Sequence, residues 1–393
     1  MMLKAFKYRL NPTEEQIVLL NKHIGASRFL YNLALETKQM AYVGNKHNIS
    51  CFELHSQLTD LKEELPWLKE LNSQSLQQAI TNLDKAYTAF FKGQNSFPKF
   101  KKKTNGGSFN IPQRVMVENG KLIIPKFTKK NGIDIVLHRP LKGEIRQATI
   151  SKTPTGKYFV SILCETGGQN KPKNKVKEET TIGIDLGIKD FAITSNGEVF
   201  ENPKHLRKAQ DKLKYVQSKY SKNKGKKTKQ KLAKLHEKIS NKRKDFLHKV
   251  STKLIRENQT ICLENLNVSG MIKNHNLAQA INDVSWSTFV TMLEYKAEWY
   301  GTNILKIGRF EPSSKTCSNC GHINKELTLK DRTWTCVKCN TTHDRDVNAA
   351  INIKNFSLRN ILSGTDRKNH DELPTLVGVL THEAQPIASG VGG

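Results

Sequence analysis

Residues 181–200 have the sequence TIGIDLGIKDFAITSNGEVF, and their pattern decides the fold class that we expect. A run rich in β-branched residues leads to Asp185, and a glycine follows two residues later. A second apolar run closes at the turn-forming pair Asn196–Gly197. The stretch therefore predicts a strand, a turn and a second strand, with Asp185 carried on a central strand.

Strands and helices alternate in the residues that follow. The runs TICLENL (260–266) and TNILKIG (302–308) are typical of buried strands, whereas DVSWSTFVTMLEYKAEWYG (283–301) has the period of an amphipathic helix. Residues 203–257 are basic and keep a helical period except at NKGKKTK (223–229), so we expect a helical hairpin there. This alternation predicts an α/β core.

Three acidic residues flank these elements in a pattern that suits metal-assisted chemistry. Glu264 follows the apolar run 261–263, as Asp185 follows its own run, and Asp346 stands just before VNAAINIKNF (347–356), which reads as a helix. Two carboxylates on strands and one at a helix start supply hard oxygen ligands. With such ligands a pair of magnesium ions can flank a phosphodiester.

Each carboxylate also has a purely structural interpretation. An aspartate after a strand is often a turn former, and Glu264 could pair with a lysine. Asp344 competes with Asp346, because either residue can cap the last helix. The hypothesis of a metal site therefore rests on the set of carboxylates rather than on any one of them.

Four of the seven cysteines occur in two CxxC pairs, Cys317 with Cys320 and Cys336 with Cys339. Two such knuckles bring four thiolates into the tetrahedron that zinc prefers in structural sites. His343 follows Cys339 closely, but four thiolates already complete the site, so we expect it to be a neighbouring polar residue. The other cysteines are isolated, which favours a metal site in a reducing compartment over a disulfide framework.

The chain is strongly basic, with 64 Lys and Arg residues against 36 Asp and Glu residues among 393. A formal net charge of +28 implies a polyanionic partner, and nucleic acid is the first candidate. A membrane surface is the alternative, but we find no signal-peptide pattern and no bilayer-spanning apolar run, and we expect a cytoplasmic, nucleoid-associated protein. The residues that we expect to follow a nucleic-acid backbone are Lys222, Lys224, Lys226, Lys227, Lys229 and Lys231.

The first half of the chain has a different character. KAFKYRL (4–10) alternates like a half-buried strand, and Asn11 would then cap a helix. Apolar residues recur at helical spacing to about residue 95, which predicts several packed helices. Short alternating runs separated by turn residues predict a small β-unit over 96–165, which the N-terminal strand could join. The polar segment 166–180 is typical of a linker.

Several motifs, in this order, resemble the TnpB proteins, which are transposon-encoded RNA-guided nucleases related to type V CRISPR effectors. In the second half they are GIDLGIKDFAITSNGE (183–198), ICLENL (261–266), DVSWSTFVTMLEYKAEWYG (283–301), EPSSKTCSNCG (311–321) and HDRDVNAAINI (343–353). The opening segments of the same family are similar to KAFKYRLNPTEEQ (4–16), RFLYNLALE (28–36) and SFPKFKKK (96–103). The resemblance extends to about residue 356.

The resemblance implies a multidomain α+β fold. A β-barrel wedge domain would carry a helical recognition lobe, and an RNase H-like (RuvC-like) α/β nuclease domain would contain an inserted zinc ribbon. Residues 364–393 have neither periodicity nor a charge block, so we expect a disordered tail. The expected boundaries are 1–10 and 96–165 for the wedge domain, 11–95 for the lobe, 166–180 for the linker, 181–310 and 341–363 for the nuclease domain with its basic hairpin at 203–257, and 311–340 for the ribbon.

The resemblance also assigns the acidic residues and the partners. The catalytic triad falls on Asp185 in GIDLG, Glu264 in LEN and Asp346, the second aspartate of DRD, and these residues would bind the catalytic magnesium. The ribbon would hold structural zinc. A guide RNA from the transposon end would direct cleavage of double-stranded target DNA beside a short motif that the protein reads. We expect a monomer bound to its RNA.

Three other functions fit parts of the pattern. IGIDLG (182–187) also opens the phosphate loop of actin-like ATPases, but the second, Asp-containing glycine-rich loop that these enzymes need does not follow. A transposase that transfers DNA strands would use three acidic residues without RNA. A zinc-ribbon nucleic-acid-binding regulator without nuclease activity would use the carboxylates only structurally. A defined co-purifying RNA with element-end sequence would distinguish the RNA-guided nuclease from the strand transferase and from the binding regulator.

Overall fold

The computed structural model describes residues 2–103, 106–128, 130–167, 171–328 and 330–362. The disordered tail expected at 364–393 lies outside the described residues. The chain divides into two compact units. Unit 1 comprises Met1–Gln169 with Gly225–Lys234, and unit 2 comprises Asn170–Lys224 with Leu235–Gly393.

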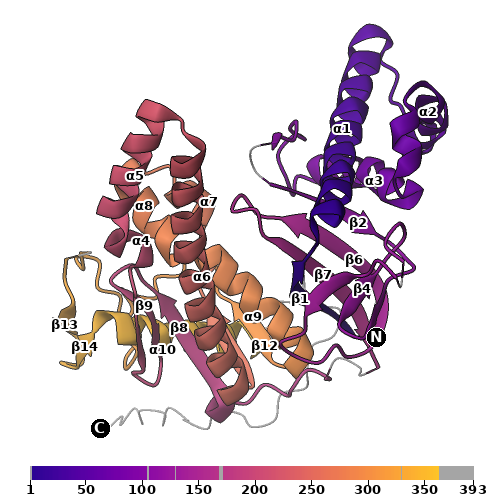
Figure 1. Cartoon of the computed structure of the whole chain (residues 1–393). Coiled ribbons are helices and arrows are strands. Elements are labelled where there is room, and N and C mark those ends of the chain that lie inside the picture. Colours follow the sequence, from indigo (N-terminus) through magenta and orange to yellow (C-terminus); the bar gives the residue numbers. More distant parts are fainter. Residues whose placement is uncertain (1, 104–105, 129, 168–170, 329, 363–393) are drawn as a thin grey trace, which may run out of the picture. The chain divides into compact units, whose positions relative to one another are not determined.

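Unit 1 is built on a seven-stranded sheet with the strand order β2-β6-β7-β1-β5-β4-β3 (Figure 1). The first strand, β1, lies between β7 and β5 and pairs antiparallel with both. In this order β2 and β3 are the edge strands. The bounds are β1 (Met2–Asn11), β2 (Gly107–Ile111), β3 (Met116–Glu118), β4 (Lys121–Ile123), β5 (Ile133–Val136), β6 (Glu144–Lys152) and β7 (Tyr158–Thr166).

The alternating sequence of β1 places every second side chain in the core. Phe6, Tyr8 and Leu10 are buried, whereas Lys7 and Arg9 between them are exposed. Burial of each large apolar side chain contributes roughly 1.5–3 kcal/mol. Strands from both ends of the sheet contribute to the same apolar cluster. The first strand of the chain is therefore an integral part of a sheet whose other strands come much later in the sequence.

Helices connect β1 to β2 and form an apolar cluster of their own, and α1 and α3 contact β2 (Figure 1). The bounds are α1 (Glu14–Asn45), α2 (Cys51–Glu64), the 3-10 helix η1 (Pro66–Glu70) and α3 (Ser73–Phe91). The prediction that Asn11 caps the first helix is wrong, because Asn11 still pairs with Asp134 in the sheet. Thr13 caps α1 instead, in a capping box with Gln16.

Unit 2 contains a five-stranded sheet with the order β10-β9-β8-β11-β12. The strand β9 is antiparallel to β8 and β10, whereas β11 is parallel to both β8 and β12. This mixed sheet with helical crossovers is the α/β core that the sequence predicts. The bounds are β8 (Thr181–Leu186), β9 (Asp190–Thr194), β10 (Val199–Glu201), β11 (Thr260–Leu263) and β12 (Asn303–Lys306).

The two faces of this sheet are covered by different helices. Ile182 and Ile184 of β8 lie in an apolar cluster with residues of α6 and α9, whereas Cys262 of β11 packs with Ile353 of α10. The helices are α4 (His205–Lys208), α5 (Gln210–Asn223), α6 (Lys226–Glu257), α7 (Val268–Met271), α8 (His275–Val284), α9 (Trp286–Tyr300) and α10 (Arg345–Leu362).

The basic hairpin has its turn where the helical period is lost. Helix α5 ends at Asn223, Lys224 adopts a left-handed φ of 45°, and α6 begins at Lys226. The six lysines singled out around this turn are exposed. Among the described residues, no helix has the length and apolar character needed to cross a membrane.

Candidate active site and metal centre

Close packing of α10 on β8 brings two of the predicted site elements together. A Cβ atom on Gly183 would lie 2.0 Å from the carbonyl oxygen of Ala350 and 2.8 Å from the backbone nitrogen of Lys354. Any side chain at this position would push the helix away. Because side chains alternate along a strand, Asp185 lies on the same face of β8 as Gly183. The glycine therefore allows α10, which carries Asp346 in its first turn, to approach the face that carries Asp185.

The electrostatics of Asp185 show that the three predicted carboxylates influence one another. The pKa of Asp185 is raised to about 7, first by burial and then by the negative charges of Glu264 and Asp346, whereas the charge of Arg345 lowers it. Ordinary aspartates titrate near pH 4, so this carboxylate is strongly destabilised as an anion. A cation bound between the carboxylates would relieve that repulsion.

Glu264 lies just beyond the end of β11 and is held from another part of the chain. The Ser313 hydroxyl donates a hydrogen bond to Glu264 Oε1 at 2.5 Å. Ser313 is almost fully buried and precedes the first cysteine pair. The carboxylate of Glu264 is thus connected to the segment that leads into the four-cysteine cluster.

Asp344 and Asp346 have different local roles. Asp344 Oδ1 accepts hydrogen bonds from the backbone amides of Asp346, at 3.0 Å, and Val347, at 2.9 Å, so Asp344 is the N-cap of α10. The Asp346 carboxylate instead contacts two guanidinium groups. Arg345 donates to Oδ1 at 2.9 Å, and Arg332 donates to Oδ2 at 3.1 Å. The Asp346 carboxylate does not cap the helix, so it is available to bind a cation in place of the two arginines.

The chemistry of these three carboxylates fits magnesium, but among the described residues only the four cysteines bring three or more ligand atoms close enough together to hold an ion in this structure. All three groups are carboxylates, which are the oxygen ligands that hard divalent cations prefer. Asp185 is buried beside two other acidic groups, both of which raise its pKa, and two arginines pair with Asp346. A cation here would favour the charged form of Asp185, which burial and the neighbouring carboxylates disfavour.

The four cysteines of the two CxxC pairs form one cluster. Their sulfur atoms all lie within 4.8 Å of one another, with 3.6 Å between Cys317 and Cys339 and between Cys320 and Cys336. Sulfurs at ~2.3 Å from a tetrahedral zinc would be roughly 3.8 Å apart. The geometry therefore fits structural zinc, as the spacing of the cysteines predicts.

His343 contacts this cluster through Cys317. Its Nε2 atom lies 3.0 Å from Cys317 Sγ, and its ring packs at 5.0 Å from that of Trp334. His343 lies on β14 (Thr342–Asp344), which pairs antiparallel with β13 (Thr333–Thr335). The hairpin that carries the second cysteine pair thus extends to Asp344, beyond the ribbon boundary that we expected at residue 340. A hydrogen bond from His343 to a zinc-bound thiolate would be a supporting contact.

Two asparagines that sequence reasoning missed connect the cysteine cluster to α10. Asn348 and Asn352 are almost fully buried. The Asn348 amide donates to the Thr316 carbonyl at 2.7 Å and accepts from the Ser318 amide at 2.9 Å. Asn352 donates to the carbonyls of Ser313, at 2.8 Å, and Thr316, at 2.6 Å. The available signal was two asparagines four residues apart in the predicted helix, a spacing that places both on one face.

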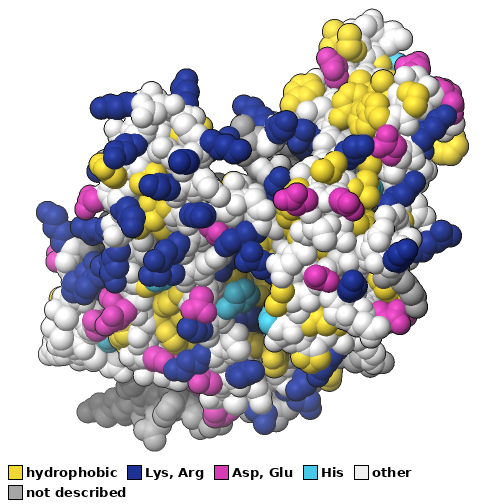
Figure 2. Space-filling view, viewed as in Figure 1, with side chains coloured by type: hydrophobic (Ala, Val, Ile, Leu, Met, Phe, Trp, Pro, Cys, Tyr) yellow, Lys and Arg dark blue, Asp and Glu magenta, His cyan; other side chains and the backbone are white. Residues whose placement is uncertain are grey.

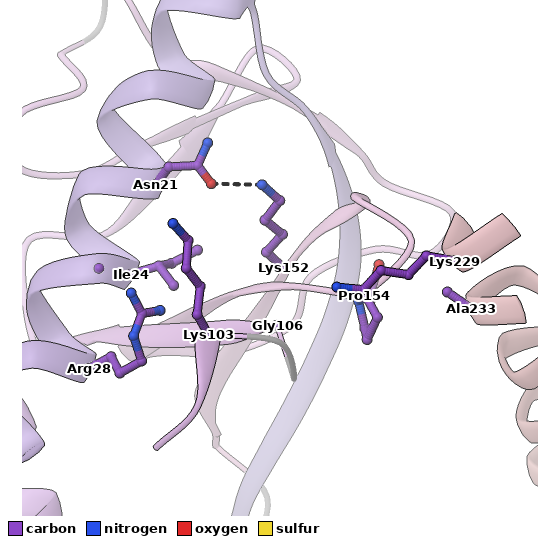
Figure 3. Close-up of a pocket in the computed structure, with 11 residues that line it drawn as sticks. Asn21, Ile24, Arg28, Lys103, Gly106, Lys152, Pro154, Lys229 and Ala233 are labelled. Atoms are coloured by element: carbon purple, nitrogen blue, oxygen red, sulfur yellow. Dashed lines mark hydrogen bonds between the residues drawn. The ribbon is translucent and has the colours of Figure 1, made fainter. Parts of the chain in front are cut away.

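Basic side chains gather on both units. In the view of Figure 2, Lys and Arg side chains are dense over α4, α5 and α6. In unit 1, Arg28 of α1, Lys103 and Lys152 of β6 surround a hollow (Figure 3), and Lys152 donates to Asn21 at 2.8 Å. None of the described residues that line this hollow is acidic. Such a hollow suits phosphate groups of a nucleic acid.

Comparison with known proteins identifies the family. Family models match residues 286–353 ("Cas12f1-like, TNB domain"), 161–275 ("Probable transposase") and 1–47 ("Helix-turn-helix domain"). A "Putative RNA-guided DNA endonuclease" of Streptomyces pristinaespiralis is 40% identical over 361 residues, which are 89% of this chain and 88% of that protein. The chain belongs to the TnpB (IS605 OrfB) family.

A second relative supports this placement, and a solved structure has a similar fold. "Putative RNA-guided DNA endonuclease InsQ" of Escherichia coli (strain K12) is 32% identical over 376 residues, which are 89% of this chain and 91% of that protein. The fold is similar to that of Cas12f1 in a Cas12f1–sgRNA–target DNA complex, with a TM-score of 0.53, 14% identity and coverage of 87% and 83% of the two chains.

Two of the family-model matches can be compared with the helices and strands that they cover. The TNB match contains α9, all four cysteines and the first turns of α10, so it includes Asp346. The match described as helix-turn-helix covers β1 and α1, which in this TnpB protein are a sheet strand and one 32-residue helix. Within that segment β1 is therefore part of the seven-stranded sheet, and α1 is a single helix rather than a pair of helices.

Proposed function

We propose that this TnpB protein is an RNA-guided DNA endonuclease in which Asp185, Glu264 and Asp346 bind two catalytic magnesium ions. The observation that carries the proposal is the mutual electrostatic influence of these three carboxylates on the α10 side of the sheet. The names of two relatives, which describe RNA-guided DNA endonucleases, support the same activity. The carboxylates alone would not specify RNA guidance, so that part rests on family membership.

The side chains of the site would divide the work of hydrolysis. Asp185, Glu264 and Asp346 would hold the cations and fix their separation. When bound, magnesium ions activate the attacking water and stabilise the charge on the leaving oxygen. The guanidinium of Arg332, which now pairs with Asp346, would be released when Asp346 binds a cation and would lie near the phosphate. The sheet and α10 would hold the three carboxylates in fixed positions during the reaction.

The partners we propose are a guide RNA from the transposon end and a double-stranded DNA target beside a short flanking motif. Positive charge on the α5–α6 turn and in the hollow of unit 1 supports contacts with a nucleic-acid backbone. We further propose that unit 1 contains the wedge domain, formed by the seven-stranded sheet, and the helical recognition lobe, formed by α1–α3. The five-stranded sheet would be the RNase H-like nuclease core, and the four cysteines would bind structural zinc.

The proposal is tested with the full chain purified together with RNA transcribed from the end of its transposon. We expect this complex to cleave a duplex that matches the RNA, in the presence of magnesium and next to one flanking motif selected from a randomised set. The same complex with Asp185→Asn is the matched control and should bind RNA without cleaving. A wild-type complex that shows no magnesium-dependent cleavage of any matched duplex would sink the proposal.

A DNA strand transferase is the second candidate, because one matching family model is described as a transposase. The same reaction distinguishes the two functions, since strand transfer joins a 3′ end to a new phosphate and leaves a branched or recombined product. Hydrolysis leaves free ends on both sides of the cut. Joined products that form without RNA would favour the transferase.

A further inference from the structure

The segment between β12 and the first cysteine pair lies between the two candidate metal sites. Ser313 in this segment is only 6% exposed, and its hydroxyl lies 2.5 Å from Glu264 Oε1. Such a short distance is typical of a hydroxyl that donates to a charged carboxylate. Glu264 follows the last residue of β11. The hydrogen bond from Ser313 fixes the position of its Oε1 atom.

Ser313 is in turn held by α10. Its carbonyl oxygen accepts from Asn352 at 2.8 Å, and the same asparagine donates to the Thr316 carbonyl at 2.6 Å. The Thr316 amide donates to the Pro312 carbonyl at 3.0 Å, which closes a tight turn around Ser313. Helix α10 thus holds Asp346 directly and reaches Glu264 indirectly, through the turn that contains Ser313.

The four-cysteine cluster is fastened to the same turn. Asn348 of α10 binds the Thr316 carbonyl on one side of Cys317 and the Ser318 amide on the other. The Cys317 amide donates to the His322 carbonyl at 2.8 Å within the first knuckle. A change in the position of Cys317 would therefore move the turn whose hydroxyl holds Glu264.

We propose that Ser313 is a positioning residue that pre-orients Glu264 for divalent-cation binding, and that the metal-loaded cysteine cluster keeps Ser313 in place. This inference rests on the proposed metal-dependent nuclease function. A pre-oriented carboxylate loses less side-chain entropy when it binds a cation, so the affinity of the acidic cluster is higher. The single hydrogen bond to Oε1 leaves the remaining lone pairs of the Glu264 carboxylate free for the cation.

The first test compares Ser313→Ala with Ser313→Thr, which keeps the hydroxyl, and with Ser314→Ala, which removes the neighbouring hydroxyl. Manganese binding to the full, zinc-loaded chain is measured by electron paramagnetic resonance, and binding to Asp185→Asn gives the background. We expect Ser313→Ala to weaken manganese binding by about tenfold, with zinc content and unfolding temperature unchanged. Higher magnesium should restore its cleavage rate. Equal affinities of Ser313→Ala and the wild type, or an equal loss in Ser314→Ala, would overturn the inference.

The second test examines the link to the cysteine cluster by a double-mutant cycle. Cys336→Ser should weaken manganese binding as Ser313→Ala does, and the double variant should lose little more than either single variant, because both changes release the same carboxylate. Losses that multiply would show that the cluster does not act through Ser313. The outcome is separable from that of the proposed function. A wild-type chain that binds manganese in a Ser313-dependent way but cleaves no matched DNA would refute only the nuclease proposal.

Discussion

Asp346 of the acidic cluster follows Cys339 of the four-cysteine cluster by only seven residues, yet the two clusters are assembled differently. The cysteines come from two short knuckles, and the hairpin of β13 and β14 brings the second knuckle back to the first. The carboxylates come from β8, the end of β11 and the start of α10, which meet only when the sheet and α10 pack. The comparison teaches that a metal can organise the first site, whereas the second depends on the fold around it.

The largest expected effect comes from removing one ligand of the four-cysteine cluster. Cys336→Ser should reduce the zinc content from one ion per chain to none, because an apparent binding free energy of about 10–16 kcal/mol for structural zinc is largely folding free energy. Metal analysis and limited proteolysis of residues 317–344 measure this, with Cys51→Ser of unit 1 as the control. The strands β8 and β11 should keep their hydrogen-exchange protection. Loss of that protection would mean that the ribbon and the sheet fold as one unit.

The next effect concerns the acidic side. Asp346→Asn should reduce cleavage by about a thousandfold, equivalent to about 4 kcal/mol of transition-state stabilisation, while RNA binding is retained. Asp344→Asn is the matched control, because asparagine is also a good N-cap and α10 should begin as before. Cleavage rates and RNA affinities of both variants provide the measurement. Near-normal cleavage by Asp346→Asn, with loss in Asp344→Asn, would reverse the assignment.

The pH dependence of stability sharpens the contrast, because folding buries Asp185 and places it near two other carboxylates. The pKa of Asp185 is raised to about 7 from 3.8, so the folded protein keeps a proton that the unfolded chain releases. The free energy of unfolding should therefore decrease as pH rises from about 4 to about 7, by at most about 4 kcal/mol. Urea unfolding in magnesium-free buffer measures this decrease, which Asp185→Asn should flatten. An unchanged pH profile in that variant would contradict the assignment.

The smallest effect tests whether close packing assembles the acidic cluster. Gly183→Ala should destabilise the protein by about 1–3 kcal/mol through overpacking, because its Cβ would meet the backbone of α10 at Ala350. The shift of α10 should also weaken manganese binding while leaving the zinc content at one per chain. Urea unfolding and metal binding are the measurements, and Gly197→Ala, at a turn with open space but a positive φ, controls for a general loss of glycine. Unchanged manganese affinity would show that α10 can shift without moving the acidic cluster out of position.

Much of the secondary structure of unit 2 follows from the local pattern of residues. The runs before Asp185 and Glu264 form the parallel strands β8 and β11, and VNAAINIKNF lies in α10. The start of α1 was misplaced because β1 pairs through Asn11, and this pairing is a long-range contact that no local signal reports. The roles of His343, Asn348 and Ser313 were also missed, since each depends on a partner from a distant part of the chain.

CxxC spacing predicts the cysteine cluster because each knuckle is too short to place its two sulfurs far apart, and zinc supplies the energy that joins the pairs. The sequence also indicates a polyanionic partner, because net charge depends on composition and not on conformation. The choice between Asp344 and Asp346 has a different origin. Only packing of α10 on Gly183 and pairing of β14 with β13 determine which carboxylate caps the helix and which contacts Arg332. Such roles depend on distances between residues far apart in sequence, and those distances exist only in the folded chain.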